Sequence, residues 1–204
     1  PPAQAAELAA APAEIPAAPA IDMGPMYAFT EVAGSGQLVA VMRKALPIEV
    51  KMIDAANSQP VSDLPVTFEI ISGEGSLSGA VSDGTRKMTV KTDKTGKAII
   101  PLAVGRKVES IYVRASAGDP ARFNLVELTI PITVTPGPPV KIEKVSGDLQ
   151  EAIAGEELKE ALAVRITDEY GNPTPNAKIQ YSILKGNGRL DTIRLNDPRD
   201  NESL

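Results

Sequence analysis

Two segments of this chain carry nearly the same pattern and align without a gap. VTFEIISGEGSL starts at Val66, and IQYSILKGNGRL starts at Ile179, which is 113 positions later. In both, apolar residues alternate with polar ones, as in a strand with one buried face, and the run ends in Gly-x-Gly-x-Leu. The segments that begin at Gly24 and Gly137 keep the same separation. One offset shared by distant segments predicts a tandem repeat of a unit of roughly 110 residues.

The sequence around these segments predicts an all-β fold. Short runs of alternating apolar and polar residues recur and are separated by turns rich in Asp, Asn, Gly and Pro. This pattern is typical of a β-sandwich or a barrel. Pro131 lies inside the last run and indicates an edge position, because Pro cannot donate a ladder hydrogen bond. The predicted strands cover residues 26–32, 47–54, 64–71, 86–92, 97–103, 110–116 and 122–134.

Composition divides the chain into three parts. Residues 1–23 are rich in Ala and Pro, which predicts an extended N-terminal arm or linker because Pro interrupts helices. Residues 24–135 contain the first set of predicted strands, and residues 136–204 contain the second, incomplete set. Pro and Gly break strand pairing, so the predicted interdomain linker consists of Pro136, Gly137, Pro138 and Pro139.

The second copy contains only its N-terminal part. At the repeat offset Leu204 corresponds to Lys91, so residues 136–204 lack counterparts of Thr92 to Val134, which is about three strands. A sandwich without these strands has unpaired ladder groups and an open core face. Two expectations follow: either the chain continues beyond these residues, or another chain supplies the strands by strand addition.

Composition argues against several classes of function. The chain has no His and no Cys, and it therefore lacks the commonest general base, thiolate nucleophiles and disulfides. We expect no enzymatic activity and no cofactor other than calcium. The net charge of -5 provides no basic field for nucleic acid. No segment has the length and apolar character of a membrane span, and the absence of Trp argues against carbohydrate binding by aromatic stacking.

Oxygen-rich loops provide the candidate metal ligands. Because calcium prefers carboxylate and amide oxygens, the candidates are Asp168, Glu169, Asn172, Asp197 and Asp200. Their spacing is not that of a dedicated calcium loop, and solvated turns are the alternative interpretation.

The Gly-x-Gly pairs are also compatible with a phosphate loop, but no helix is predicted after them, as such a loop requires. We interpret the glycines as structural turn residues, namely Gly73, Gly75, Gly96, Gly186 and Gly188.

The order of the motifs resembles the group 1 bacterial immunoglobulin-like domains, the invasin and intimin type. The first copy carries IDAANSQPV, VTFEI, SGEGSL, TDKTGKAII and VRASA in the order of that family, and the second carries AVRITDEYGNP. The first copy departs from the pattern in AANSQP, which lacks the usual glycine. The resemblance covers about residues 24–204. It implies an immunoglobulin-like β-sandwich, in one complete and one incomplete copy, without catalytic residues.

The resemblance also implies an exported protein located at the cell surface, outside the cell or in the periplasm. It implies a rigid spacer that displays adhesive or other domains, with other protein chains or further repeats of the same chain as partners. The alternative is an assembly or accessory subunit of an extracellular filament or envelope complex. In that case the N-terminal arm and the incomplete second domain contact partner chains.

Overall fold

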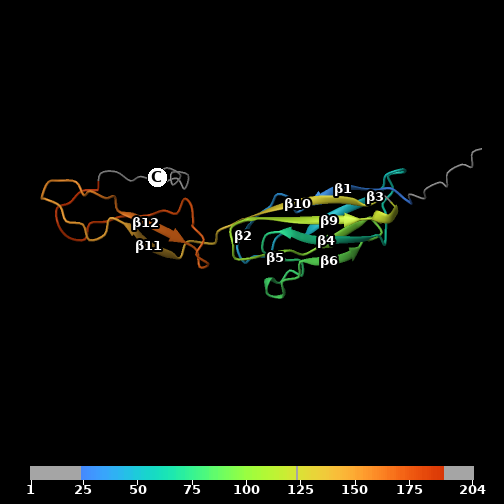
Figure 1. Cartoon of the computed structure of the whole chain (residues 1–204), viewed down its shortest axis with the longest axis horizontal. Helices are drawn as coiled ribbons and strands as arrows, with labels where there is room; N and C mark the ends of the chain where they lie inside the picture. The colour runs from blue at the N-terminus through green and yellow to red at the C-terminus, as the bar shows by residue number, and fades with distance from the viewer. Residues whose placement is uncertain (1–23, 123, 191–204) are drawn as a thin grey trace, which may run out of the picture. The chain divides into compact units, whose positions relative to one another are not determined.

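The computed structural model describes residues 24–122 and 124–190, and the chain divides into two compact units (Figure 1). The first unit comprises Pro1–Gly105 and Glu109–Val134, and the second comprises Arg106–Val108 and Thr135–Leu204. In the described ranges, no helix has the length and apolar character needed to cross a bilayer.

Most described elements are strands, accompanied by two short 3₁₀ turns, η1 and η2. In chain order the elements are β1 Tyr27–Ala33, β2 Leu38–Ala40, β3 Ile48–Asp54, β4 Pro65–Ser72, β5 Gly75–Ser76, η1 Val81–Asp83, β6 Lys87–Lys91, β7 Lys97–Ile100, β8 Ala103–Val104, β9 Ser110–Ala117, η2 Pro120–Arg122, β10 Val126–Thr135, β11 Lys141–Ser146 and β12 Ala163–Thr167.

The first unit is an immunoglobulin-like β-sandwich. One sheet has the strand order β1-β3-β7, and the other has the order β2-β10-β9-β4-β6. The central pairs β3–β7, β4–β9 and β9–β10 are antiparallel. A small ladder of β5 with β8 completes the unit. The all-β, immunoglobulin-like fold expected from the sequence is confirmed.

Alternation along the strands places the core between the two sheets. In β3, Ile48, Val50 and Met52 are fully buried, while the residues between them are half-exposed. Phe68 in β4 is also fully buried and is the largest side chain in the core. Burial of each such side chain stabilises the fold by about 1.5–3 kcal/mol. The other large, fully buried side chains are aliphatic: Leu77, Ile100, Leu102, Ile111, Ile130, Ile132, Val66 and Val104.

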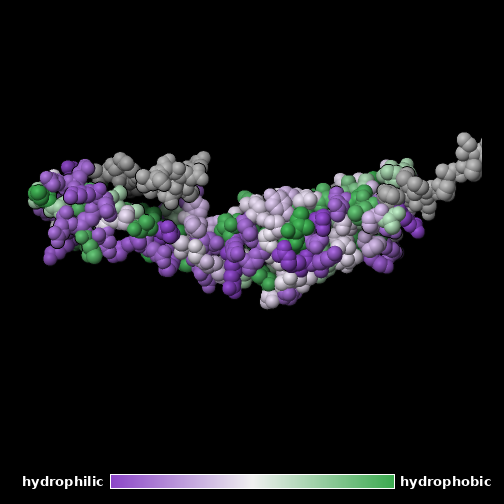
Figure 2. Space-filling model, in the orientation of Figure 1, coloured by the Kyte–Doolittle hydropathy of each residue, from purple (hydrophilic) through white to green (hydrophobic). Residues whose placement is uncertain are grey.

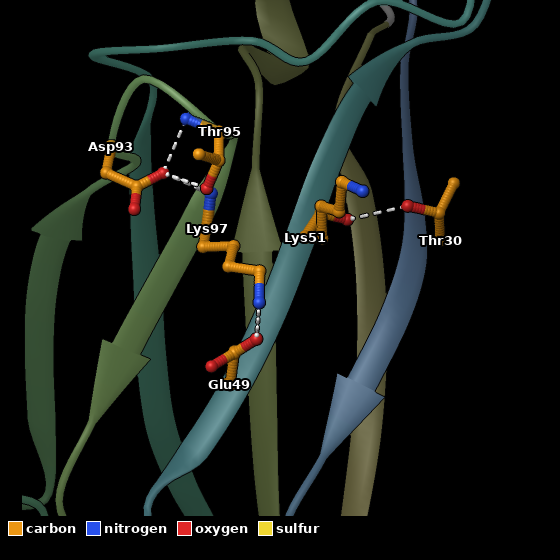
Figure 3. Close-up of polar contacts among 6 residues, drawn as sticks. All are labelled: Thr30, Glu49, Lys51, Asp93, Thr95 and Lys97. Atoms are coloured by element: carbon orange, nitrogen blue, oxygen red, sulfur yellow. Dashed lines mark hydrogen bonds and ion pairs between the residues drawn. The ribbon is translucent and has the colours of Figure 1, made fainter.

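Polar contacts join neighbouring strands on the outer face of the three-stranded sheet (Figure 3). Lys97 of β7 forms an ion pair with Glu49 of β3, with 2.6 Å between Nζ and Oε1. In the turn before β7, Asp93 Oδ1 accepts hydrogen bonds from the hydroxyl and the backbone N–H of Thr95, at 2.7 and 2.8 Å. The Thr95 hydroxyl is the main cause that lowers the pKa of Asp93. These contacts fix the position of β7 beside β3.

Pro131 does not lie on an edge strand, contrary to the sequence prediction. β10 lies between β9 and the short strand β2. The Pro131 carbonyl accepts from Gly36 N–H at 2.8 Å, and Thr133 N–H donates to the Gln37 carbonyl at 3.0 Å. Because alternate residues of a strand point their N–H groups the same way, the N–H that Pro131 lacks would face the β2 side. The pairing of β10 with β9 is therefore intact.

The second unit contains one antiparallel pair, β11 with β12, among its described residues. Residues 179–190 form no strand, although they repeat the pattern of β4. In the first unit β4 is held between β6 and β9. At the repeat offset the counterpart of β9 would be numbered after Leu204, so this segment has no such partner within the 204 residues. A strand pattern without a pairing partner does not form a ladder.

Candidate functional site

The turn after β12 is built around the side chain of Asp168. Its Oδ1 atom accepts hydrogen bonds from the backbone N–H groups of Tyr170 and Asn172, both at 2.9 Å. Its Oδ2 atom accepts from Gly137 N–H at 2.9 Å. Gly171 has φ +86°, a conformation that glycine adopts without strain. The sequence Asp-Glu-Tyr-Gly-Asn-Pro thus folds locally into a closed turn.

The carboxylate of Asp168 is only 3% exposed, and it is surrounded by hydrogen-bond donors. Burial raises its pKa, but hydrogen bonds from the Asn172 side chain and from the backbone of Gly137, Asn172 and Tyr170 together outweigh burial and leave the pKa below its usual value. The Asn172 amide also donates to the Arg106 carbonyl, at 2.8 Å within the second unit. Calcium requires oxygen ligands, whereas N–H groups already occupy these oxygens.

The structure describes only one of the other acidic calcium candidates, Glu169. Glu169 is exposed, and Asp197 and Asp200 lie outside the described residues. Within residues 24–122 and 124–190, no group of three or more acidic side chains is arranged to hold a metal ion. The geometry of Asp168 and Asn172 is that of a hydrogen-bonded turn.

A polar cluster in the first unit, around the buried Ser76 and the exposed Asp83, was not identified from the sequence. Ser76 is fully buried, and its hydroxyl donates to Asp83 Oδ1 at 2.5 Å and lies 3.0 Å from the Ser78 hydroxyl. Hydrogen bonds from Ser76, then Ser78, and then the Thr85 N–H lower the pKa of Asp83 to about 2. These hydrogen bonds stabilise the charged form of the Asp83 carboxylate. The cluster anchors η1 against β5.

The predicted turn glycines occupy different environments. Gly73 directly follows β4 with φ +88°, and a Cβ atom there would lie 2.8 Å from the Ile111 side chain. Gly75 belongs to β5, and Gly96 lies in the turn before β7. In the second unit, Gly186 and Gly188 follow a segment without strand structure. The first helical element after Gly75 is the three-residue 3₁₀ turn η1, which begins only at Val81, so the geometry of a phosphate loop is absent at the first pair.

The predicted linker residues Pro136, Gly137, Pro138 and Pro139 connect β10 to β11. Of these, Gly137 takes part in the turn described above through its N–H.

Core positions of the repeat are buried in the first unit but open in the second. Ile70 is 2% exposed, and its counterpart Ile183 is 44% exposed. Leu77 is fully buried, and its counterpart Leu190 is 50% exposed. Leu162 of the second unit is 45% exposed. Figure 2 shows green, hydrophobic patches within the mainly purple surface of this unit. These exposed apolar positions of the second unit, Leu162, Ile183 and Leu190, are the candidate functional site.

Solved structures that are similar to the chain include two intimin fragments and an S-layer protein. The D00-D0 domain of intimin is 18% identical over 55% of this chain and 49% of its own, with a TM-score of 0.36. The S-layer protein is 18% identical over 72% of this chain and 17% of its own, with a TM-score of 0.34. The third structure is the C-terminal 282-residue fragment of intimin in complex with the intimin-binding domain of the translocated intimin receptor. It is 16% identical over 69% of this chain and 45% of its own, with a TM-score of 0.37.

These similarities are distant. The chain spans less than half of the length of each of the three structures. No family model matches the chain, and no curated protein matches it. The fold is established by the sheet topology of the first unit, and at this identity the similarities do not extend to function.

Proposed function

We propose that this chain is a non-catalytic, structural region of an exported bacterial surface or envelope protein. In this proposal two immunoglobulin-like units in tandem, the second of them incomplete, act as a rigid spacer that displays adhesive or other domains. The motif order that resembles group 1 bacterial immunoglobulin-like domains supports the surface location. The closed, aliphatic core of the first unit supports the structural role.

One matched hydrogen-bond pattern carries the tandem-repeat part of the proposal. The Gln37 side chain donates to the Leu46 carbonyl at 3.1 Å and accepts from the Leu46 N–H at 2.8 Å. Gln150, which is 113 positions later, makes the same two bonds with Glu160, both at 2.8 Å. Each glutamine also donates to the carbonyl of the glycine three positions before it. Such a bidentate contact depends on a specific backbone geometry, and its recurrence supports a repeated structural unit.

The turns after β3 and β12 also match. Asp54 Oδ1 accepts from the N–H of the residue two positions later at 2.8 Å, and Asp168 Oδ1 does so at 2.9 Å. Pro60 forms an isolated bridge with Ile53, near the end of β3, and Pro173 forms one with Thr167, at the end of β12. The same local structure therefore follows the same strand in both units.

Distances between spin labels test the spacer role. The chain has no Cys, so cysteines introduced at two exposed positions label it specifically. We expect the pair at Lys94 and Glu157, one in each unit, to give a distance distribution as narrow as the control pair at Lys44 and Lys94 within the first unit. A distribution several times broader than the control would refute a rigid spacer. Cleavage by protease added to intact cells of the source tests the surface location.

A second candidate function is assembly with another chain by strand addition, and the exposed apolar positions of the second unit favour it. Exposed core positions such as Leu162 and Ile183 leave apolar surface in water that a sandwich would bury. The mass of the protein in its native complex tests this candidate. This candidate would be refuted if the protein stays a monomer of this chain alone at high concentration while its second unit remains folded.

A further inference from the structure

One edge of β12 has no strand paired to it among the residues that the structure describes. Among the described residues the sheet of the second unit contains β11 and β12 alone. In the first unit the corresponding edge of β3 pairs with β7, and the residues in register are Ile48 with Ile100, Val50 with Ala98, and Lys51 with Lys97. In this stretch the two units are aligned on Asp54 and Asp168, which are 114 positions apart because the second unit has one extra residue before β12. At the β3 positions of this register, the second unit therefore has Leu162, Val164 and Arg165.

The segment that follows the Asp168 turn does not occupy this edge. Thr174 N–H donates to the Ile166 carbonyl at 2.9 Å, near the end of β12. The first unit has the equivalent bond, from Val61 N–H to the Met52 carbonyl at 3.2 Å, and it still accommodates β7 farther along β3. The part of β12 from Ala163 to Arg165 is therefore geometrically suited to another strand.

The charges on this edge differ between the units. In the first unit Lys97 of β7 pairs with Glu49 of β3 at 2.6 Å (Figure 3). In the second unit Ala163 stands at the position of Glu49. A lysine at the same place of an added strand would find no carboxylate there and would lie opposite a second cation, Arg165, which is unfavourable.

An acidic residue on the added strand fits this edge better. Arg165 lies opposite Glu143 of β11, but Glu143 forms an ion pair with Lys141, and this contact is the first cause of its lowered pKa. A carboxylate on the other side of Arg165 would add a second cross-strand pair of opposite charge.

We propose that the free edge of β12 binds an antiparallel strand from another polypeptide chain. This strand has aliphatic or small apolar residues opposite Leu162 and Val164 and an acidic residue opposite Arg165. The inference rests on the proposed repeat and specifies the partner in the second candidate function.

Two peptides of residues 93–104 serve as probes, one with the natural sequence and one with Lys97→Glu. Hydrogen exchange of the 204-residue protein, monitored by mass spectrometry, reports binding at each strand. We expect the Lys97→Glu peptide to slow exchange in 163–165 and to bind about fivefold more tightly than the natural peptide. The segment 48–51 provides an internal control, since its own β7 already covers it.

Charge reversal on the protein provides the matched variant. In the Arg165→Glu protein the preference should reverse in favour of the natural peptide, and in the Arg165→Gln protein it should disappear. A circular dichroism spectrum that matches the wild type shows that each variant is folded. If the Arg165→Glu protein does not fold, the Arg165→Gln protein alone tests the charge preference.

Three results would overturn the proposal. The first is slow exchange at 163–165 without any peptide, which would mean that the chain already covers this edge. The second is no slowing at millimolar peptide. The third is equal affinity for both peptides without reversal, and in that case strand addition as a function would stand while the acidic requirement fails.

Discussion

Truncation of Phe68 should cost far more stability than truncation of its repeat counterpart, Tyr181. Phe68 is fully buried, and its neighbours in register on the adjacent strands are Met88 and Ala115. Phe68→Ala loses about 2–3 kcal/mol of burial. It also leaves a cavity that the small Ala115 cannot fill and that the paired backbones keep open, so the total loss is about 4 kcal/mol. Tyr181 is half-exposed in a segment without strand structure, so Tyr181→Ala should cost less than about 1 kcal/mol.

Urea unfolding followed by circular dichroism measures this difference. With a slope near 2 kcal/mol per molar urea, Phe68→Ala should lower the midpoint of the first unit by about 2 M, and Tyr181→Ala should leave it nearly unchanged. The control is an unaltered slope, which shows that the unfolded reference state is the same. A Tyr181→Ala loss as large as that of Phe68→Ala would refute the contrast between a closed and an open core. A Phe68→Ala loss below 1 kcal/mol would refute the burial argument itself.

Three further predictions concern turns and charges. Gly34 has φ +79°, and a Cβ atom there would lie 2.7 Å from the Pro47 carbonyl oxygen. Gly34→Ala should therefore lower the free energy of unfolding in urea by about 3 kcal/mol. Gly36 also has a positive φ but faces open space, so Gly36→Ala should lower it by about 1 kcal/mol. The pKa of Asp83 is lowered to about 2 in the folded state. Ionised Asp83 should therefore stabilise the fold fully above pH ~4, and this stabilisation should be lost as the pH falls toward 2. Profiles of melting temperature against pH should show this loss in the natural protein and not in the Asp83→Asn variant. Since the oxygens of Asp168 accept N–H hydrogen bonds, neither calcium nor a chelator should shift the melting temperature; a rise of several degrees with calcium would restore the metal-site hypothesis.

Period-two alternation was sufficient to predict the longer strands of the first unit. β3, β4 and β9 begin and end within about one residue of their predicted bounds. The prediction of a strand at 122–134 was wrong at its start, because η2 ends at Arg122 and β10 begins only at Val126. The short strands β2 and β5 were not predicted, because two or three residues carry no period. The predicted strand at 97–103 is divided by Pro101 into β7 and β8, since Pro lacks the N–H that a continuous ladder requires. Sheet order was not predictable from alternation, which does not identify the pairing partner.

The candidate site shows why local and non-local features of the repeat differ. The bonds of Gln150 with Glu160 and of Asp168 with the Asn172 N–H span ten residues or fewer, so local sequence is sufficient to form them, whereas the bond of Asp168 with Gly137 joins residues 31 positions apart. Burial of Ile183 requires strands that are far away in sequence, as burial of Ile70 requires β9 in the first unit. A repeat can therefore reproduce its turns faithfully while its core positions stay open. Local motifs identify the unit, whereas burial of its core positions depends on strand pairing.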